Sequence, residues 1–140
     1  MTIKKIYYKN RKYRYNISNN TFMKEKIKMG YMRHHAIVVT GWREKDVMAA
    51  HQKACELFGD QNFLGRISHI SEITPEATNG YRSFMVSPDG SKEEWETSDR
   101  GDAARDKFIN WLSSNEDIYC HYAEVQFADE EGDDKLLRTG

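Results

Sequence analysis

The order of apolar and polar positions from residue 33 onward predicts strands and helices in alternation. A β-branched apolar run over 33–40, ended by Gly41, predicts a central strand. Over 43–58 the apolar residues recur at helical spacing, and Gly59 supplies a left-handed stop. Further strands are predicted over 66–73, 81–87, 119–128 and, as a short C-terminal strand, 135–139.

A second helix is predicted after a long polar segment over 87–102. Asp99 is its predicted N-cap, and Asp102 is the capping-box partner of the weaker Asp type. One apolar face then follows, made by Ala104, Phe108, Trp111 and Leu112.

The predicted order is β-α-β-β-α-β with a short C-terminal strand, as in a ferredoxin-like split βαβ unit. The fold class is therefore α+β, an antiparallel β-sheet with two helices on one face. The other face stays open unless a ligand, a partner or a second copy covers it. Because Tyr81, Tyr119 and Tyr122 are predicted to be exposed there, we expect a homo-oligomer.

Charge divides the chain, although its net value is only −1. Residues 1–31 carry nine Lys or Arg against Glu25 alone, a net charge of +8, so 32–140 carry −9. We therefore predict a basic N-terminal extension or translated leader over 1–31 and a single α+β domain over 32–140. A leader is favoured because organised sequence starts after Met32. A tyrosine-bearing arm for nucleic acid, and an added strand or oligomer contact, stay open.

Cysteine usage and hydropathy predict a cytoplasmic protein. Cys55 and Cys120 lie far apart, which excludes a disulfide-rich scaffold and fits a reducing compartment. No apolar run approaches the roughly 18 residues of a membrane span, and 1–31 lack the apolar core of a signal peptide. The charge of −9 over the predicted domain argues against a nucleic-acid partner.

The histidines form no convincing catalytic or metal-binding set. His34 and His35 are adjacent on a predicted strand, so they point to opposite faces and cannot share a metal. His69 begins an H-x-S motif that resembles half of a paired signature in which two histidines are needed. We therefore predict no enzyme, no catalytic residue, no metal site and no cofactor.

Two positions are candidates for binding an anion. Trp95 lies beside Lys92, Arg100 and a predicted helix N-terminus, which together suit an anion or a base. Alternatively, the indole only packs the loop onto the core. Arg138 on the last strand is either a solvated terminal side chain or a phosphate ligand.

Four segments, HHAIVVTGW, NGYRSFMVSPDGSKEEW, SDRGDAARDKFINWL and HYAEVQFADEEGDDKLLRTG, resemble small phage-encoded accessory proteins. Within that group they are most similar to the Thoeris anti-defence proteins of the first type, over about residues 32–140. The resemblance implies a multimeric sponge in the host cytoplasm. Such a protein binds the cyclic ADP-ribose-type signal of a bacterial TIR-domain enzyme and sequesters it uncleaved.

The resemblance also implies residue roles. The implied ligand-binding residues are Arg138 and Thr139 at phosphate, Trp111 or Phe108 stacked on the base, and His121 and Glu124 as polar readers of base or ribose. A function from a different class stays open. The chain can instead be a phage inhibitor that binds a protein through an acidic, tyrosine-bearing surface.

Overall fold

A computed structural model describes residues 3–8, 11–16, 31–62 and 65–140 and divides the chain into two units, Met1–Gly30 and Tyr31–Gly140. In the first unit, β1 (Ile3–Tyr8) and β2 (Arg11–Asn16) pair as an antiparallel hairpin. Tyr31 belongs with the second unit, because its hydroxyl donates a 2.6 Å hydrogen bond to Asp133. The boundary therefore lies one residue earlier than predicted. The nature of the basic segment stays a prediction.

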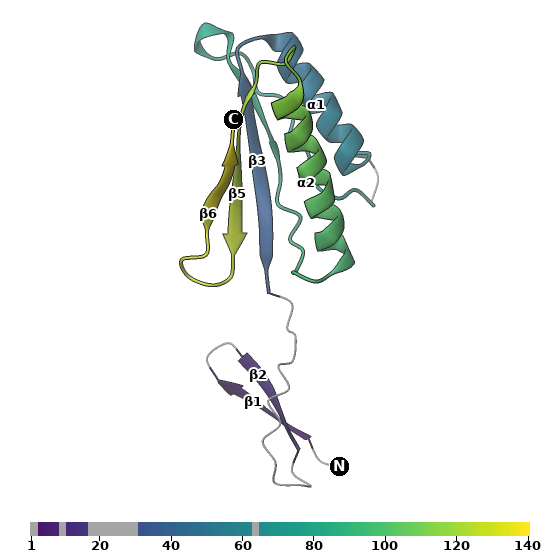
Figure 1. The fold of residues 1–140 in the computed structure, drawn as a ribbon, viewed down its shortest axis with the longest axis vertical. Helices are drawn as coiled ribbons and strands as arrows, with labels where there is room; N and C mark the ends of the chain where they lie inside the picture. The colour runs from purple at the N-terminus through teal and green to yellow at the C-terminus, as the bar shows by residue number, and fades with distance from the viewer. Residues whose placement is uncertain (1–2, 9–10, 17–30, 63–64) are drawn as a thin grey trace. The chain divides into compact units, whose positions relative to one another are not determined.

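The second unit is an antiparallel sheet covered by two helices, which confirms the predicted α+β fold class (Figure 1). Along the sheet the strands follow the order β4-β3-β5-β6. The elements are β3 (Arg33–Gly41), α1 (Glu44–Phe58), the 3-10 turn η1 (Thr78–Gly80), β4 (Arg82–Val86), α2 (Glu96–Ser114), β5 (His121–Ala128) and β6 (Lys135–Thr139). No helix in the described part of the chain has the length and apolar character needed to cross a membrane.

The core lies between the helices and one face of the sheet. Phe58 of α1 and Phe108 of α2 meet edge to face, with ring centroids 6.1 Å apart, and both side chains are fully buried. The buried cluster comprises Ile37, Val39, Val47, Ala50, Ala54, Phe58, Ile70, Phe84, Val86, Ala104, Phe108, Ile109 and Leu112. The apolar spacings that predicted the elements are thus the spacings that fill the core.

The strand predicted over 66–73 is wrong, because this segment forms only an isolated bridge, between Ile70 and Val86. It still runs beside β4. Ser71 donates its amide to the Met85 carbonyl at 2.9 Å, but Met85 donates back to the Ser71 hydroxyl at 2.8 Å. In a regular ladder the acceptor would be the Ser71 carbonyl.

Thr74 repeats this pattern three residues later. Its amide donates to the Ser83 carbonyl at 2.8 Å, and the Ser83 amide donates to the Thr74 hydroxyl at 3.0 Å. Three residues of the segment therefore match two residues of β4, an offset related to a β-bulge. This offset explains why Ile70 and Ile73 repeat with period three rather than two.

Helix α2 begins at Glu96, four residues before the start that an N-cap at Asp99 predicts. Trp95 is the N-cap, and its carbonyl accepts from the amides of Ser98 at 2.9 Å and Asp99 at 3.1 Å. Asp99 therefore lies in the first turn, and Asp102 pairs with Arg105 at 2.5 Å rather than completing a capping box. A backbone carbonyl begins this helix, so the side-chain capping signal indicated the wrong residue.

In strand β5 two polar side chains face the helices and apolar side chains face the open side of the sheet, the reverse of the usual arrangement. Glu124 lies opposite Ile37 and Gln126 opposite His35, so these two polar side chains face the helices and are buried. The open face consequently carries apolar residues, of which Val38, Met85, Phe127 and Leu136 are exposed. Tyr122 was predicted to be exposed, but it is half-buried and packs against the core. The expected homo-oligomer stays a prediction.

Candidate ligand-binding site

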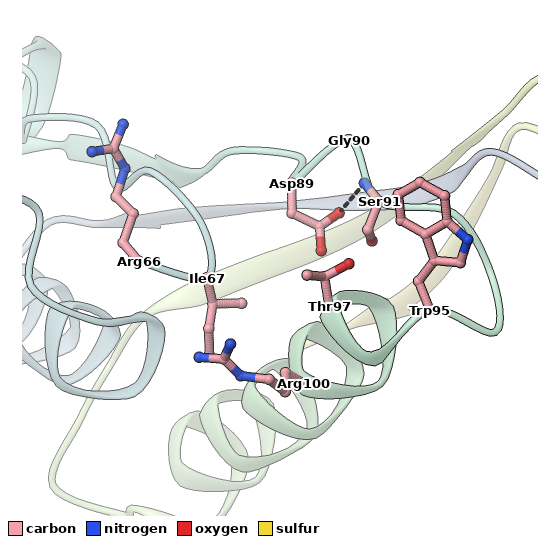
Figure 2. A pocket seen from close by; sticks show the side chains of 8 residues that line it. All are labelled: Arg66, Ile67, Asp89, Gly90, Ser91, Trp95, Thr97 and Arg100. Carbon is pink, nitrogen blue, oxygen red and sulfur yellow. Dashed lines mark hydrogen bonds between the residues drawn. The ribbon is translucent and has the colours of Figure 1, made fainter. Parts of the chain in front are cut away.

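A cavity of about 260 Å³ lies at the N-terminus of α2. Figure 2 shows the loop before the helix on one side of it and the first turn of α2 on the other. Its lining residues are Arg66, Ile67, Asp89, Gly90, Ser91, Trp95, Thr97 and Arg100. A loop, a segment beside β4 and a helix terminus thus converge on one hollow.

The helix terminus is open to a ligand. No side chain caps α2, and the amides of Ser98 and Asp99 already bond to the Trp95 carbonyl. The two preceding amides, of Glu96 and Thr97, have no acceptor within the helix. Free amides and the helix dipole favour an anion at this place.

The Trp95 indole, which is 52 % exposed, lies at one end of the cavity and Arg66 at the other (Figure 2). Arg66 and Arg100 line the cavity with exposed side chains, and Lys92 Nζ lies 5.3 Å from the indole centroid. Within the described residues, Arg100 forms no ion pair or hydrogen bond. Guanidinium groups suit phosphate oxygens, and an exposed indole suits the flat face of a base.

Asp89 is the only carboxylate among the lining residues, and its side chain lies between Ser91 and Thr97 (Figure 2). Asp89 Oδ1 accepts a 3.2 Å hydrogen bond from the Ser91 amide. Its Oδ2 lies 3.9 Å from Nη1 of Arg105, a side chain that is 2 % exposed. Arg105 thus offsets part of the charge of Asp89, although Asp89 Oδ2 accepts no hydrogen bond within the described structure.

Ser91 adds an unused hydroxyl to the wall. The residue is 6 % exposed, and its Oγ has no hydrogen-bond partner within the described structure. A buried hydroxyl without a partner costs free energy. A polar ligand atom that reached this wall would satisfy it.

A second cavity, of about 410 Å³, lies between α2 and the strands β5 and β6. It is lined by His35, Asp102, Arg105, Asp106, Glu124, Leu137 and Arg138. Arg138 Nε lies 2.5 Å from Glu124 Oε2, and its Nη1 donates to Asp106 at 2.8 Å. The expectation of a terminal arginine with little to pack against is wrong, because two carboxylates hold Arg138.

These contacts shift the ionisation of both partners. Burial alone would raise the pKa of Glu124, but hydrogen bonds from His35 and Arg138 and the arginine charge outweigh it and lower the pKa to about 2. The hydrogen bond to Glu124 raises the pKa of Arg138. With Arg138 neutralised by Glu124 and Asp106, the first cavity is the better anion site.

The predicted binding residues are not brought together. Trp95 lines the first cavity, whereas Glu124 and Arg138 line the second. Phe108 is fully buried, so its stacking on a ligand would require the core to open. Trp111 is half-buried and packs against the same core. His121 and Thr139 lie on β5 and β6 and line neither cavity.

The sequence analysis missed Arg66, Ser91 and Thr97. Arg66 had been placed on a strand, and nothing in the sequence places it across from Trp95. Ser91 and Thr97 lie in the polar segment whose Trp95 and Arg100 were recognised, so the segment itself was the available signal.

Neither cysteine is an activated nucleophile. Burial raises the pKa of the Cys55 thiol. Burial, assisted by Asp46, raises the pKa of Cys120 to about 11. Both thiols are therefore protonated at neutral pH. Among the described residues, no group of three His, Cys, Asp or Glu side chains is arranged to hold a metal ion.

Comparisons of the chain with protein-family models, curated proteins and solved structures found no match.

Proposed function

We propose that this chain binds a cyclic nucleotide signal of the cyclic ADP-ribose type and sequesters it uncleaved in the host cytoplasm, as a phage anti-defence sponge. One observation carries the proposal. The cavity at the start of α2 combines the exposed Trp95 indole, two arginines and an uncapped helix N-terminus. The ligand class comes from the sequence resemblance described above.

Each part of such a ligand has a suitable counterpart in this cavity. A purine stacks on the indole, and stacking of this kind tolerates different bases because every base has a π-face. The phosphates lie toward Arg66, Arg100 and the free amides of α2. The cavity is smaller than the roughly 300–1,000 Å³ of a typical small-molecule site. A cyclic ADP-ribose, which carries a single base, would therefore place its adenine inside and its second ribose at the mouth.

The lining of the cavity favours storage over cleavage. Asp89 is its only carboxylate, and that side chain is held by Ser91 and Arg105. Hydrolysis of a phosphodiester or glycosidic bond by side chains alone needs a group that gives a proton and another that takes one. We therefore propose that the bound ligand is released unchanged.

Titration calorimetry with cyclic ADP-ribose tests the proposal on matched tryptophan variants. Trp95→Ala is expected to weaken binding about 5- to 150-fold, the loss of one stacked base. Trp42→Ala removes an indole of similar exposure, 56 % against 52 %, that lies outside the cavity, and is expected to leave affinity unchanged.

Ligand recovered by heating the complex should co-elute with the input molecule. If the wild-type chain does not bind cyclic ADP-ribose, or if the two variants bind equally well, this cavity is not the site. Gradual appearance of linear ADP-ribose would instead reveal catalysis.

A second candidate function rests on an aromatic surface elsewhere on the unit. Trp42, Tyr81 and Tyr119 are all exposed, and the backbone at Gly41 and Trp42 passes close to both Tyr119 and Gly80. Arg43 lies over the Tyr119 ring at 4.8 Å. Tryptophan, tyrosine and arginine dominate the energetics of protein interfaces. We propose, as the alternative, an inhibitor that docks on a protein through this surface.

The two tryptophan variants also separate these functions in cells that carry a TIR-domain defence. Loss of protection by Trp95→Ala alone supports the sponge. Loss by Trp42→Ala alone supports the protein-binding inhibitor.

A further inference from the structure

We propose, on the basis of the function proposed above, that Asp89 and Ser91 recognise a ribose hydroxyl of the ligand. The cavity at the start of α2 then prefers a ribonucleotide over its deoxy analogue. A carboxylate among the lining residues is not explained by phosphate binding, because it repels an anion. It is explained when the same ligand also brings a hydrogen-bond donor to this wall.

Both side chains are buried, and each holds an atom without a hydrogen-bond partner in the described structure. The Asp89 side chain is 5 % exposed, and its Oδ2 accepts no hydrogen bond. Ser91 is 6 % exposed, and its Oγ neither donates nor accepts one. Burial of polar atoms in this state costs free energy that a partner recovers. Two such atoms on one cavity wall point to a polar ligand group.

The chemistry of the two atoms defines that group. A carboxylate oxygen only accepts a hydrogen bond, so the partner of Asp89 is an O–H or N–H donor. The Ser91 hydroxyl can donate as well as accept, so its partner can also be an acceptor. Two neighbouring hydroxyls on one ribose supply both roles. Phosphate oxygens supply only acceptors and do not bind the carboxylate.

The positions of the lining residues match the order of groups in a nucleotide. Figure 2 shows Trp95 at one end of the cavity, Arg66 at the other and Asp89 between them. In a nucleotide the ribose joins the base to the phosphate. With the base stacked on Trp95 and the phosphates toward Arg66, the ribose lies beside Asp89 and Ser91. The N–H donor of adenine stays with the base at the Trp95 end.

Asp89 is held in position before any ligand binds. Its Oδ1 accepts a 3.2 Å hydrogen bond from the Ser91 amide, and Arg105 Nη1 lies 3.9 Å from its Oδ2. Arg105 is itself buried and bound to Asp102. A fixed acceptor loses little side-chain freedom on binding, so a hydrogen bond to it contributes more to affinity. A ligand that lacks the hydroxyl leaves this buried acceptor unpaired and is rejected.

Titration calorimetry of the full chain compares cyclic ADP-ribose with its analogues that lack the adenosine 2′- or 3′-hydroxyl. At least one analogue should bind about 5- to 150-fold more weakly, because a buried polar atom then stays unpaired. Ser91→Ala should narrow this difference. Ser68→Ala is the matched control, since Ser68 is 3 % exposed and its Oγ also has no partner in the described structure, but it does not line the cavity. It should leave both affinity and preference unchanged.

Asp89→Asn separates recognition from repulsion by the sign of its effect. If Asp89 accepts a hydrogen bond from the ligand, this variant binds cyclic ADP-ribose more weakly, because a charge-assisted hydrogen bond is lost. Tighter binding would mean that the carboxylate only repels phosphate, and it would overturn the proposal. The melting temperature of each variant shows whether it is folded, and Ser91→Ala keeps the amide that binds Asp89.

The outcomes distinguish this proposal from the proposed function. If wild type binds cyclic ADP-ribose and both analogues equally, hydroxyl recognition is overturned and the sponge function stands. If wild type does not bind cyclic ADP-ribose, the sponge function fails, and adenosine monophosphate with its two deoxy analogues becomes the probe. A preference for adenosine monophosphate over at least one of them supports hydroxyl recognition alone. Equal binding or no binding of the three overturns it as well.

Discussion

Glu124 is a carboxylate at the centre of a charge cluster on the helix side of the sheet. It is 1 % exposed and lies 2.9 Å from His35 Nδ1, 2.5 Å from Arg138 Nε and 3.9 Å from Arg105 Nε. Through these contacts one residue joins β3, β5, β6 and α2. A buried charge held in this way stabilises the fold only while its partners are present.

The lowered pKa of Glu124 predicts a specific acid sensitivity. The folded-state pKa, about 2, lies below the ordinary value of 4.5, so the stabilisation is complete above about pH 5 and is lost as pH falls toward 2. The loss amounts to up to about 3 kcal/mol. Urea unfolding of Glu124→Gln between pH 7 and pH 2 should show a flatter pH profile than wild type. Parallel profiles would mean that other carboxylates carry the effect.

A double-mutant cycle with Arg138→Ala is the control for this result. At pH 7 Arg138→Ala is expected to cost about 2–4 kcal/mol, because it leaves the buried Glu124 carboxylate without this partner. Glu124→Gln should cost less, because Arg138 is half-exposed and keeps its ion pair with Asp106. The double variant should cost clearly less than the sum of the two, since Glu124 and Arg138 are in contact.

The sequence singled out Glu124 and Arg138 but not their contact with each other. Both were assigned to a ligand, which stays a prediction, and in the structure they also bind each other. The pairing follows from a register shift between Glu124 and Val125 that brings Arg138 opposite Glu124. No local pattern specifies that shift. Asp106, on α2, joins the pair only through tertiary packing.

Within α2, Gly101 interrupts a segment that is otherwise favourable for a helix. A Cβ atom at this position would lie 2.7 Å from Asp89 Oδ2 and 3.0 Å from Arg105 Nη1. Glycine therefore lets the loop that carries Asp89, one wall of the first cavity, pack directly on the helix.

Gly101→Ala is consequently expected to destabilise the protein, although alanine has a higher helix propensity than glycine. Propensity alone predicts a gain of about 1 kcal/mol, but the crowding costs about 1–3 kcal/mol and displaces Asp89. We expect a net loss of up to about 2 kcal/mol in urea unfolding, together with about tenfold weaker binding of cyclic ADP-ribose.

Ala103→Gly, at an exposed position of the same helix, is the matched control. It should cost about 1 kcal/mol and leave affinity unchanged. A stabilised Gly101→Ala chain with wild-type affinity would contradict the proposed packing of the loop.

At the scale of elements, apolar periodicity predicted the bounds of a strand or helix correctly where one face of that element is buried. The ranges 33–40, 43–58 and 135–139 match β3, α1 and β6 to within one residue. Apolar periodicity predicted a strand over 66–73 wrongly. Beside this segment, the hydroxyls of Ser71 and Thr74 accept the hydrogen bonds that backbone carbonyls accept in a regular strand pair. The start of α2 was missed because the Trp95 carbonyl begins the helix without a side-chain cap.

For the whole molecule, the boundary between the two units predicts where the chain can be shortened. Starting the chain at Tyr31 removes only the first unit, and its melting temperature should stay within about 4 °C of the full chain, the effect of about 1 kcal/mol in a domain of this size. Starting at Arg33 also removes the Tyr31 carbonyl that accepts from Glu93 and the Met32 carbonyl that accepts from Asp129. This second chain should melt more than about 4 °C lower in calorimetry. Equal melting of the two shortened chains would place the boundary after Met32.

The hydroxyl groups beside β4 also affect how the protein behaves when it is concentrated. A strand at the border of a sheet usually offers a row of unused amides to other chains, which is how ordered aggregates begin. Here the outward amides of Ser83 and Met85 are taken by Thr74 and Ser71, and that of Ser87 by the His69 carbonyl. Fibril-like stacking through this border is therefore blocked by the segment 69–74, which uses two hydroxyl side chains and its own backbone groups. Removing both hydroxyls would free the amides of Ser83 and Met85, and we expect this border to become more prone to pairing with other chains.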